Sequence, residues 1–368
     1  MISDHIKTAI KTYFKDEATP GQENLISLLS QFVVSSGEDD AFLIKGFAGT
    51  GKTTVLAAFA ETLLSLKIRI VLLAPTGRAA KVLSSFTGKP AFTIHKKIYR
   101  QRSSKDGMGL FVLNANLSTD TFFIVDEASM IANQSAEQSI FGSGKLLDDL
   151  VEFVYSGRNC RLVLSGDTAQ LPPVGLDISP ALDKSELQMN YGLQVTECIL
   201  TDIVRQSEQS GILHNATSIR CLIDSNSITL PEFSLSPFKD IIRLSGKDVV
   251  EAISDCYDKY GIEETMVICR SNKNANTYNA GIRNRILYRE EELSSGDYLM
   301  VVKNNYYWLG EDESSDFIAN GDVARVVKIR KIEEKYGYRF ANATLCFSDY
   351  NNLEIEAKIL INTLTSES

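Results

Sequence analysis

The feature that most constrains this chain is a glycine-rich segment, GFAGTGKT, at residues 46–53. It matches the pattern G-x-x-x-x-G-K-[ST] and lies between an apolar run at 41–47 and a helical pattern at 55–66. Glycines let backbone N–H groups surround phosphate oxygens, and the N-terminus of the following helix adds positive potential. In this pattern Lys52 reaches the β- and γ-phosphates and the Thr53 hydroxyl can ligate Mg²⁺. A chance glycine-rich turn is the alternative, but the flanking strand and helix favour a nucleotide site.

Short apolar runs alternate with helical patterns from residue 41 to about residue 200. The four strand candidates are AFLIKGF (41–47), IRIVLLA (68–74), TFFIVDE (121–127) and RLVLSGD (161–167). Each is nearly continuous in β-branched and large apolar residues, which is typical of parallel strands with helices on both faces. The sequence therefore predicts an α/β fold with a parallel sheet. Two helical stretches around Thr19-Pro20-Gly21 precede it.

Polar side chains follow two of these strands. Asp126 and Glu127 end the third strand, where the first carboxylate can hold Mg²⁺, largely through water, and the second can orient and deprotonate a water molecule. Gln170 follows the fourth strand and a tight Ser-Gly-Asp turn, and its neutral amide can sense a γ-phosphate. Alone, each segment could be an ordinary solvated strand end. Their order after the phosphate loop favours a site of nucleotide hydrolysis.

The composition excludes several classes of protein. Of the 368 residues, 44% are apolar and 23% are charged, which argues against disordered and fibrous proteins. No apolar run approaches the roughly 20 residues of a membrane span, and the first residues, MISDHIKTAIKTYF, do not resemble a signal peptide. These features predict a soluble cytoplasmic protein with no membrane partner.

The net charge and the cysteine content limit the kinds of ligand that the protein is expected to bind. The net charge of −9 argues against a surface that binds nucleic acid everywhere, although a local basic groove remains compatible with it. The six cysteines are scattered, without a C-x-x-C pair: Cys160, Cys198, Cys221, Cys256, Cys269 and Cys346. Free, mostly buried thiols are therefore expected rather than a zinc or redox site.

The second half of the chain changes character after about residue 206. Residues 212–290 have helical patterns and one buried-strand candidate, TMVICR (265–270). Residues 294–364 contain short strand patterns separated by turn residues. The strand candidates there are 297–305, 324–332, 339–347 and 353–361. This part predicts a small all-β module of barrel type.

Taken together, these segments resemble the RecD/Dda-like DNA helicases of superfamily 1B, to which exodeoxyribonuclease V α-subunits are similar. The residues that carry the resemblance are TPGQENL (19–25), GFAGTGKTT (46–54), LLAPTGRAAKVL (72–83), IVDEASM (124–130), SGDTAQLPPVG (165–175) and ILTDIVRQ (199–206). The match extends over about residues 15 to 330, and the APTGRAA and GDxxQLPPV strings are more specific than a phosphate loop alone.

The resemblance implies a domain organisation. It implies a RecA-like first motor domain at 1–205, with a small hairpin insert at about 96–120 that carries a strand-separating pin. A partial second RecA-like domain at 206–293 and an SH3-like β module at 294–368 follow. Because nothing matches the family's motifs V and VI, this chain is expected to be a truncated form that binds nucleotide but hydrolyses it poorly and unwinds little DNA.

It also implies the nucleotide-site residues, with ATP and Mg²⁺ as cofactors. Gln22 would pair with the adenine edge, and Arg205 would reach the γ-phosphate, unless it is a surface arginine. The catalytic residues would be Lys52, Glu127, Gln170 and Arg205, and the metal would lie between Thr53 and Asp126. The nucleotide-binding set would be Gln22, Gly46, Ala48, Gly49, Thr50, Gly51, Lys52, Thr53 and Thr54.

The expected DNA partners are single strands and duplex junctions. The residues implied to contact DNA are Pro75, Thr76, Thr93, His95, Arg270 and Asn272. Packing in the core is an alternative for His95, and it is the commoner role for Tyr99 and Phe111, the wedge candidates of the hairpin, and for Trp308.

The resemblance implies an ATP-driven 5′-to-3′ translocase that acts in DNA repair or recombination, with protein partners from those pathways. A regulatory ATPase that grips single strands without moving is the rival interpretation. A nuclease is a weaker one, because no further carboxylate cluster has metal-ligand spacing.

Overall fold

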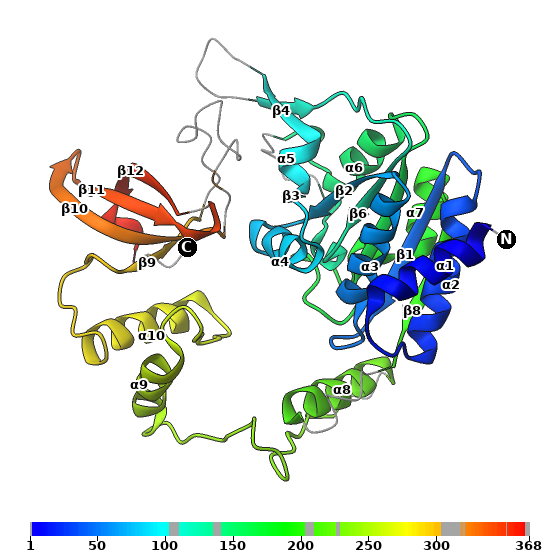
Figure 1. Cartoon of the computed structure of the whole chain (residues 1–368). Coiled ribbons are helices and arrows are strands. Elements are labelled where there is room, and N and C mark those ends of the chain that lie inside the picture. Colours follow the sequence, from blue (N-terminus) through cyan, green and yellow to red (C-terminus); the bar gives the residue numbers. More distant parts are fainter. Residues whose placement is uncertain are drawn as a thin grey trace. The chain divides into compact units, whose positions relative to one another are not determined.

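The computed structural model describes residues 2–102, 110–134, 141–202, 210–225, 229–302, 318, 321–350 and 352–364. The chain forms two compact units, Met1–Phe238 and Lys239–Ser368 (Figure 1). Each unit has its own hydrophobic core.

A six-stranded parallel sheet forms the centre of the first unit, in the order β3-β2-β6-β7-β1-β8. Its strands are β1 (Asp40–Gly46), β2 (Arg69–Ala74), β3 (Ala91–Thr93), β6 (Thr121–Val125), β7 (Arg161–Gly166) and β8 (Gln194–Leu200). The four predicted strands are confirmed to within two residues. The edge strands β3 and β8 were not predicted, because β3 has three residues and β8 is half exposed. The predicted α/β class with a RecA-like sheet is confirmed.

Helices lie on both faces of this sheet (Figure 1). The described helices of the first unit are α1 (Ile2–Phe14), α2 (Pro20–Val34), α3 (Lys52–Ser65), α4 (Gly77–Thr87), α5 (Ile94–Ile98), α6 (Leu146–Tyr155), α7 (Lys184–Tyr191) and α8 (Gly211–Asp224), of which α8 lies apart from the two faces of the sheet. The predicted break before α2 is confirmed: the Thr19 hydroxyl accepts a hydrogen bond from the N–H of Gln22, and Pro20 opens the helix.

Aromatic rings from α2, α3 and the sheet form the middle of the first core. Phe32 contacts Phe42 and Phe122 edge-on, with ring centroids 5.3 and 5.9 Å apart. Phe59 of α3 meets Phe122 at 6.1 Å in the same manner. Such edge-to-face pairs add to the free energy of burial, so these rings fix α2 and α3 on one face of the sheet.

Arg161 is a buried cation at the start of β7, only 7% exposed. Its guanidinium donates hydrogen bonds to the carbonyl oxygens of Phe32, at 2.6 Å, and Val33, at 3.3 Å. These carbonyls belong to the last turn of α2 and lack helical partners. Arg161 therefore ends α2 against the sheet.

Within the hairpin insert predicted at about 96–120, β4 (Tyr99–Arg102) and β5 (Leu110–Leu113) form a two-stranded antiparallel sheet, and the insert as a domain stays a prediction. Tyr99 and Phe111 are each 5% exposed and pack with His95 around Phe141, with ring centroids 4.9 to 5.2 Å from it. The Tyr99 hydroxyl donates to Asp149 of α6 at 2.6 Å. The two wedge candidates therefore pack in the described structure, as the alternative interpretation held.

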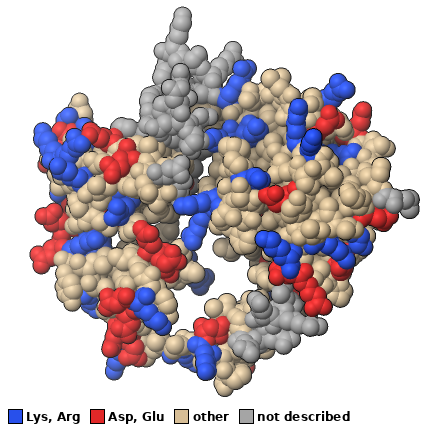
Figure 2. All heavy atoms as spheres, in the orientation of Figure 1, with Lys and Arg blue, Asp and Glu red and all other residues tan. Residues whose placement is uncertain are grey.

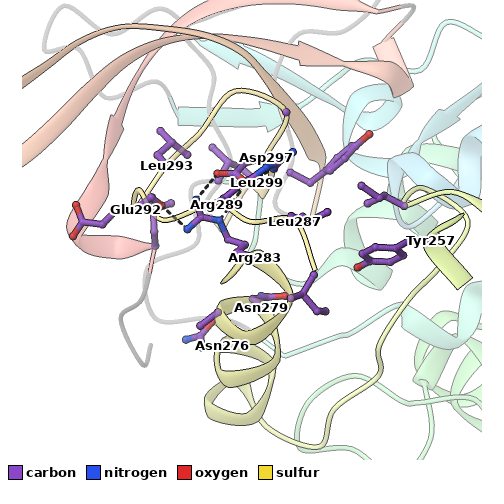
Figure 3. A pocket seen from close by; sticks show the side chains of 16 residues that line it. Tyr257, Asn276, Asn279, Arg283, Leu287, Arg289, Glu292, Leu293, Asp297 and Leu299 are labelled. Atoms are coloured by element: carbon purple, nitrogen blue, oxygen red, sulfur yellow. Dashed lines mark hydrogen bonds and ion pairs between the residues drawn. The ribbon is translucent and has the colours of Figure 1, made fainter. Parts of the chain in front are cut away.

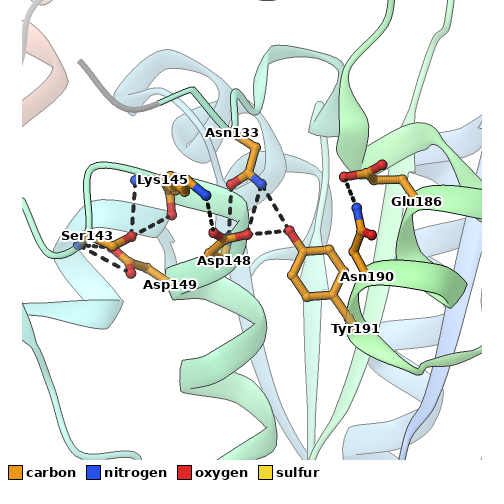
Figure 4. A network of polar contacts seen from close by, with 8 residues as sticks. All are labelled: Asn133, Ser143, Lys145, Asp148, Asp149, Glu186, Asn190 and Tyr191. Carbon is orange, nitrogen blue, oxygen red and sulfur yellow. Dashed lines mark hydrogen bonds and ion pairs between the residues drawn. The ribbon is translucent and has the colours of Figure 1, made fainter. Parts of the chain in front are cut away.

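A polar network joins α6 to α7 (Figure 4). Asp148 accepts hydrogen bonds from the hydroxyl of Tyr191, at 2.6 Å, and the amide of Asn133, at 2.8 Å, and Lys145 lies 3.3 Å away. Burial alone would raise the pKa of Asp148, but these bonds outweigh it and the pKa falls below its ordinary value. The network holds the loop at Asn133 against both helices.

The described part of the second unit contains two α-helices and an antiparallel sheet in the order β12-β11-β10-β9. Its elements are α9 (Val249–Tyr260), α10 (Asn272–Arg285), β9 (Tyr298–Met300), β10 (Val323–Lys335), β11 (Tyr338–Phe347) and β12 (Leu353–Leu360). The predicted strands at 324–332, 339–347 and 353–361 are confirmed to within about three residues. Of the strand predicted at 297–305, residues 298–300 form β9, residues 301–302 are not in a strand, and residues 303–305 and Trp308 lie outside the described residues. A closed barrel, the SH3-like assignment and the predicted domain boundaries stay predictions.

The buried strand predicted at 265–270 was wrong. Residues 265–269 have no regular secondary structure, and the side chains of Met266 and Ile268 are 69% and 89% exposed. The alternation of apolar residues gives a strand only where a neighbouring strand supplies backbone hydrogen bonds. In the described part of the second unit no strand lies beside this segment.

A cavity of about 250 Å³ lies between α10 and the β module in the second unit (Figure 3). Arg283 and Arg289 both point to the carboxylate of Asp297, at 3.0 and 2.5 Å. Arg283 also donates to the backbone carbonyls of Glu291 and Glu292. These contacts tie α10 to the turn before β9.

Basic and acidic side chains are intermixed on the face shown in Figure 2. None of the helices that the structure describes has the length and apolar character needed to cross a membrane.

The aromatic core gives a test of the first unit's stability. Phe59→Ala removes a fully buried ring, and we expect the free energy of unfolding to fall by about 3–5 kcal/mol. Phe86→Ala is the matched control, because Phe86 is 58% exposed and its loss should cost less than about 0.5 kcal/mol. Urea unfolding followed by circular dichroism measures both. Equal losses in the two variants would contradict this description of the core.

Candidate nucleotide site

The glycine-rich loop joins the end of β1 to the start of α3, as predicted. Gly49 and Gly51 have φ of +79° and +78°, which side chains rarely adopt. A Cβ on Gly51 would also lie 2.6 Å from the side-chain nitrogen of Gln22. The remaining predicted nucleotide ligands, Gly46, Ala48, Thr50 and Thr54, lie in this loop and the first turn of α3.

Lys52 begins α3 and turns back over the loop. Its ammonium donates to the carbonyl oxygens of Gly46, at 2.8 Å, and Phe47, at 3.1 Å. Burial lowers the pKa of Lys52, and the negative charges of the carboxylates around it, Asp167, Asp126 and Glu127, oppose that shift. The site thus places the Lys52 ammonium among three carboxylates.

Asp126 follows β6 and is held by three donors. The hydroxyls of Thr53 and Ser165 donate to its two carboxylate oxygens, each at 2.9 Å, and the N–H of Glu127 donates at 3.0 Å. The side chain is 5% exposed. The predicted meeting of the phosphate loop and the end of β6 is confirmed by the Thr53 contact. The role of Ser165 was not predicted.

Glu127 has a strained backbone and a poorly paired carboxylate. Its φ of +57° lies in the left-handed region, which is uncommon for a residue with a side chain. One carboxylate oxygen is buried without a hydrogen-bond partner among the described residues. Burial raises the pKa of Glu127, the charge of Asp126 raises it further, and Lys52 opposes the shift. Strain and a raised carboxyl pKa are typical of catalytic positions.

Gln170 lies in the loop after β7, at the same edge of the sheet as Glu127. The Ser129 hydroxyl donates to its amide oxygen at 3.4 Å, and a hydrogen bond from Gln170 lowers the pKa of Glu127. The structure therefore brings Gln170 to the carboxylate expected to orient the water, and its role stays a prediction.

Gln22 is 2% exposed and lies against the phosphate loop. Its amide oxygen accepts from the N–H of Thr19 and its amide nitrogen donates to the carbonyl of Thr50, both at 2.9 Å. The amide nitrogen thus holds α2 to the loop, whereas the amide oxygen closes the capping box of α2 itself. The predicted pairing with adenine stays a prediction. Arg205 lies outside the described residues.

Two ion-paired residues of this site were missed, Asp167 at the end of β7 and Arg220 on α8. They are 3% and 7% exposed and pair with each other. The sequence analysis took Asp167 for part of a turn, and Arg220 lies on a helix with no motif. The only available signal for Asp167 was its position at the end of a buried strand.

The DNA candidates of the first unit lie at the ends of adjacent strands. Ala74 and Thr93 are partners in the β2–β3 register, so Pro75, Thr76 and Thr93 are brought together. The hydroxyls of Thr76 and Thr93 cap α4 and α5, each accepting a backbone N–H at 3.2 Å.

His95, the next DNA candidate along the chain, lies in the aromatic cluster of the hairpin. Burial lowers its pKa to about 4, so its imidazole is neutral near pH 7. Arg270 and Asn272 belong to the second unit, where both are exposed at the start of α10. Contact of these residues with DNA stays a prediction.

The fold and this site together define a P-loop nucleotide-binding protein. Residues 19–220 match the family model described as AAA domain. The ATP-dependent DNA helicase dda of Enterobacteria phage T4 is 24% identical over 353 residues, which cover 89% of this chain and 70% of that protein. The ATP-dependent RecD2 DNA helicase of Deinococcus radiodurans is 33% identical over 174 residues, which cover 47% of this chain but only 21% of that protein. A crystal structure of Bacteroides sp Pif1 in complex with ADP-AlF4 matches with 15% identity and a TM-score of 0.39, over 93% of this chain and 74% of that chain.

The chain belongs to the AAA domain family, and its relatives place it with the RecD/Dda-like helicases of superfamily 1B. The predicted family is therefore confirmed. The expectation that the protein is an ATP-dependent enzyme of the helicase class is confirmed too.

The buried carboxylate of Glu127 gives a test by pH. Because the folded state raises its pKa, the ionised form destabilises the fold near pH 7, where the unfolded chain is already ionised. We expect Glu127→Gln to raise the melting temperature at pH 7. The gain should shrink as the pH falls through the raised pKa of the folded state and toward the ordinary value of 4.5, and it should vanish well below 4.5, where Glu127 is protonated in both states.

Differential scanning calorimetry of the wild type and this variant measures the gain. Glu152→Gln, at an exposed position of α6, is the matched control and should show no such pH-dependent gain. A Glu127→Gln variant that melts below the wild type at pH 7 would contradict the description of this carboxylate.

Proposed function

We propose that this protein is an ATP-driven DNA helicase that moves 5′ to 3′ along single strands and acts in DNA repair or recombination. The observation that carries the proposal is the contact of the Thr53 hydroxyl with Asp126, beside the Glu127 carboxylate, one oxygen of which is buried without a hydrogen-bond partner among the described residues. This contact brings the phosphate loop, a metal-binding carboxylate and a base together. Two relatives of the protein are named as ATP-dependent DNA helicases, and these names support DNA as the polymer along which the protein moves.

ATP binding is proposed at the loop between β1 and α3. The backbone N–H groups of residues 47–53 and the N-terminus of α3 favour phosphate oxygens, and Lys52 supplies the positive charge. Thr53 and Asp126 offer the hard oxygen ligands that Mg²⁺ prefers, so the residues present fit that ion. When bound, Mg²⁺ would neutralise charge on the phosphate oxygens.

Hydrolysis is proposed to depend on Glu127. Its raised pKa and its unpaired oxygen suit a base that accepts a proton from water. Gln170, in contact with Glu127 through a hydrogen bond, is proposed to report the state of the phosphate to the loop after β7. Arg205 is proposed to stabilise the charge of the γ-phosphate.

DNA is proposed to cross the first unit at the carboxyl ends of β2 and β3. Pro75, Thr76, Thr93 and the neutral His95 lie there, and hydroxyl and backbone contacts hold a strand without reading its sequence. Duplex junctions and repair or recombination proteins are the proposed partners. The six cysteines, all free, support a reducing, cytoplasmic location.

The direction of movement can be tested with labelled duplexes that carry either a 5′ or a 3′ single-stranded tail. The full-length protein with ATP and Mg²⁺ is expected to displace the strand only from the 5′-tailed duplex. Lys52→Ala should abolish displacement, because the phosphates lose their main cation, while single-strand binding remains. Binding with ATP turnover but no displacement from either duplex would instead support a regulatory ATPase that grips DNA without moving.

Hydrolysis can be separated from binding at Glu127. Glu127→Gln is expected to lower kcat for ATP by about 10²- to 10⁴-fold, the usual contribution of a general base. The affinity for a fluorescent ATP analogue should change by less than about threefold, because Gln keeps the size of the side chain and removes a negative charge. In the wild type, kcat should fall as the pH drops through the raised pKa of Glu127. An unchanged kcat in the variant would exclude Glu127 as the base.

A further inference from the structure

Helix α8 packs directly on the phosphate loop. The guanidinium of Arg220 lies 3.5 Å from the centre of the Phe47 ring. Leu213, on the first turn of the helix, is so close to Gly49 that a Cβ there would lie 3.3 Å from it. Phe47 and Gly49 of the loop are thus neighbours of α8, and the contact between Arg220 and Phe47 is a cation–π interaction.

Arg220 also holds Asp167 with two parallel contacts. One terminal nitrogen lies 3.3 Å from one carboxylate oxygen and the other nitrogen is bonded to the second oxygen. Both side chains are more than nine-tenths buried. Such a forked pair is the strongest geometry available to arginine and a carboxylate.

Asp167 belongs to the same group of charges as the phosphate loop. It is the largest of the charges that raise the pKa of Lys52, and its charge also raises the pKa of Glu127. Burial alone would raise the pKa of Asp167, but the hydrogen bonds from Arg220 and the Ala169 N–H outweigh it. Asp167 is therefore an anion close to the place where phosphates bind.

An unpaired nitrogen favours a role for Arg220 beyond packing. Its Nε has no hydrogen-bond partner among the described residues, although it is buried. An unpaired buried donor destabilises the folded state, and an apolar side chain at this position would avoid that cost. The position of the guanidinium is therefore set by Asp167 and Phe47.

We propose that Arg220 is a positioning residue of the nucleotide site, which neutralises Asp167 and braces the phosphate loop through Phe47. The inference rests on the proposed function, because it concerns the binding of ATP. An unpaired Asp167 would repel the phosphates and compete with them for Lys52. Paired with Arg220, it leaves the Lys52 charge available to the nucleotide.

The test is a set of four proteins: the wild type, Arg220→Met, Asp167→Asn and the double variant. Titration with a fluorescent ATP analogue and Mg²⁺ gives the dissociation constant of each. Arg220→Met should weaken binding about tenfold or more, equivalent to about 1.4 kcal/mol. The double variant should return to within about threefold of the wild type, because it lacks both charges. The double-mutant cycle isolates the coupling of the pair.

Arg158→Met, at an exposed position, is the matched control and should bind as the wild type does. Circular dichroism establishes that each variant folds. If Arg220→Met does not fold, Arg220→Lys, with and without Asp167→Asn, replaces it: Lys keeps the charge but loses the forked geometry. That variant should bind about threefold more weakly and recover in the double variant.

The outcomes separate this inference from the proposed function. A wild type that binds nucleotide and an Arg220 variant that binds equally well would overturn the inference alone. A double variant as weak as the single arginine variant would also overturn it, since the loss would then come from packing of α8. A wild type that binds no nucleotide would overturn the proposed function and the inference with it.

Discussion

The hydrogen bond from the Thr53 hydroxyl to Asp126 is the interaction on which the site depends. It joins two residues 73 positions apart, one at the start of α3 and the other just after β6. It requires that β1 and β6 end at the same edge of the sheet, with β7 between them. The parallel order supplies this, because the carboxyl ends of parallel strands share one edge. The fold thus explains the site before any particular chemistry is considered.

The walls of that site are built from groups that also stabilise the fold. Gln22 links α2 to the loop at Thr50, and the Asp202 carboxylate accepts the N–H of Gly21 at 2.7 Å. Ser165 of β7 holds the second oxygen of Asp126. A loop anchored in this way is preorganised, so little conformational entropy remains to be lost when phosphates bind.

The sequence predicted four of the six strands of the parallel sheet and the residues after them, because continuous apolar runs and glycine spacing are local signals. It did not predict that Arg161 ends α2 or that Arg220 pairs with Asp167, because both partners come from distant parts of the chain. It predicted a strand at 265–270 from an apolar pattern that has no neighbouring strand in the described structure. Local patterns thus predict elements, whereas buried ion pairs and strand partners depend on tertiary contacts.

Charge balance connects these observations. The chain carries a net charge of −9, and three carboxylates lie around Lys52 at the place where a polyanion must bind. Each has a different counterpart: hydroxyls hold Asp126, Arg220 neutralises Asp167, and Glu127 keeps an unpaired oxygen. Repulsion among them is therefore concentrated on Glu127, whose pKa is raised. An acidic protein can thus hold a triphosphate, because its local pairing and not its net charge decides the potential in the site.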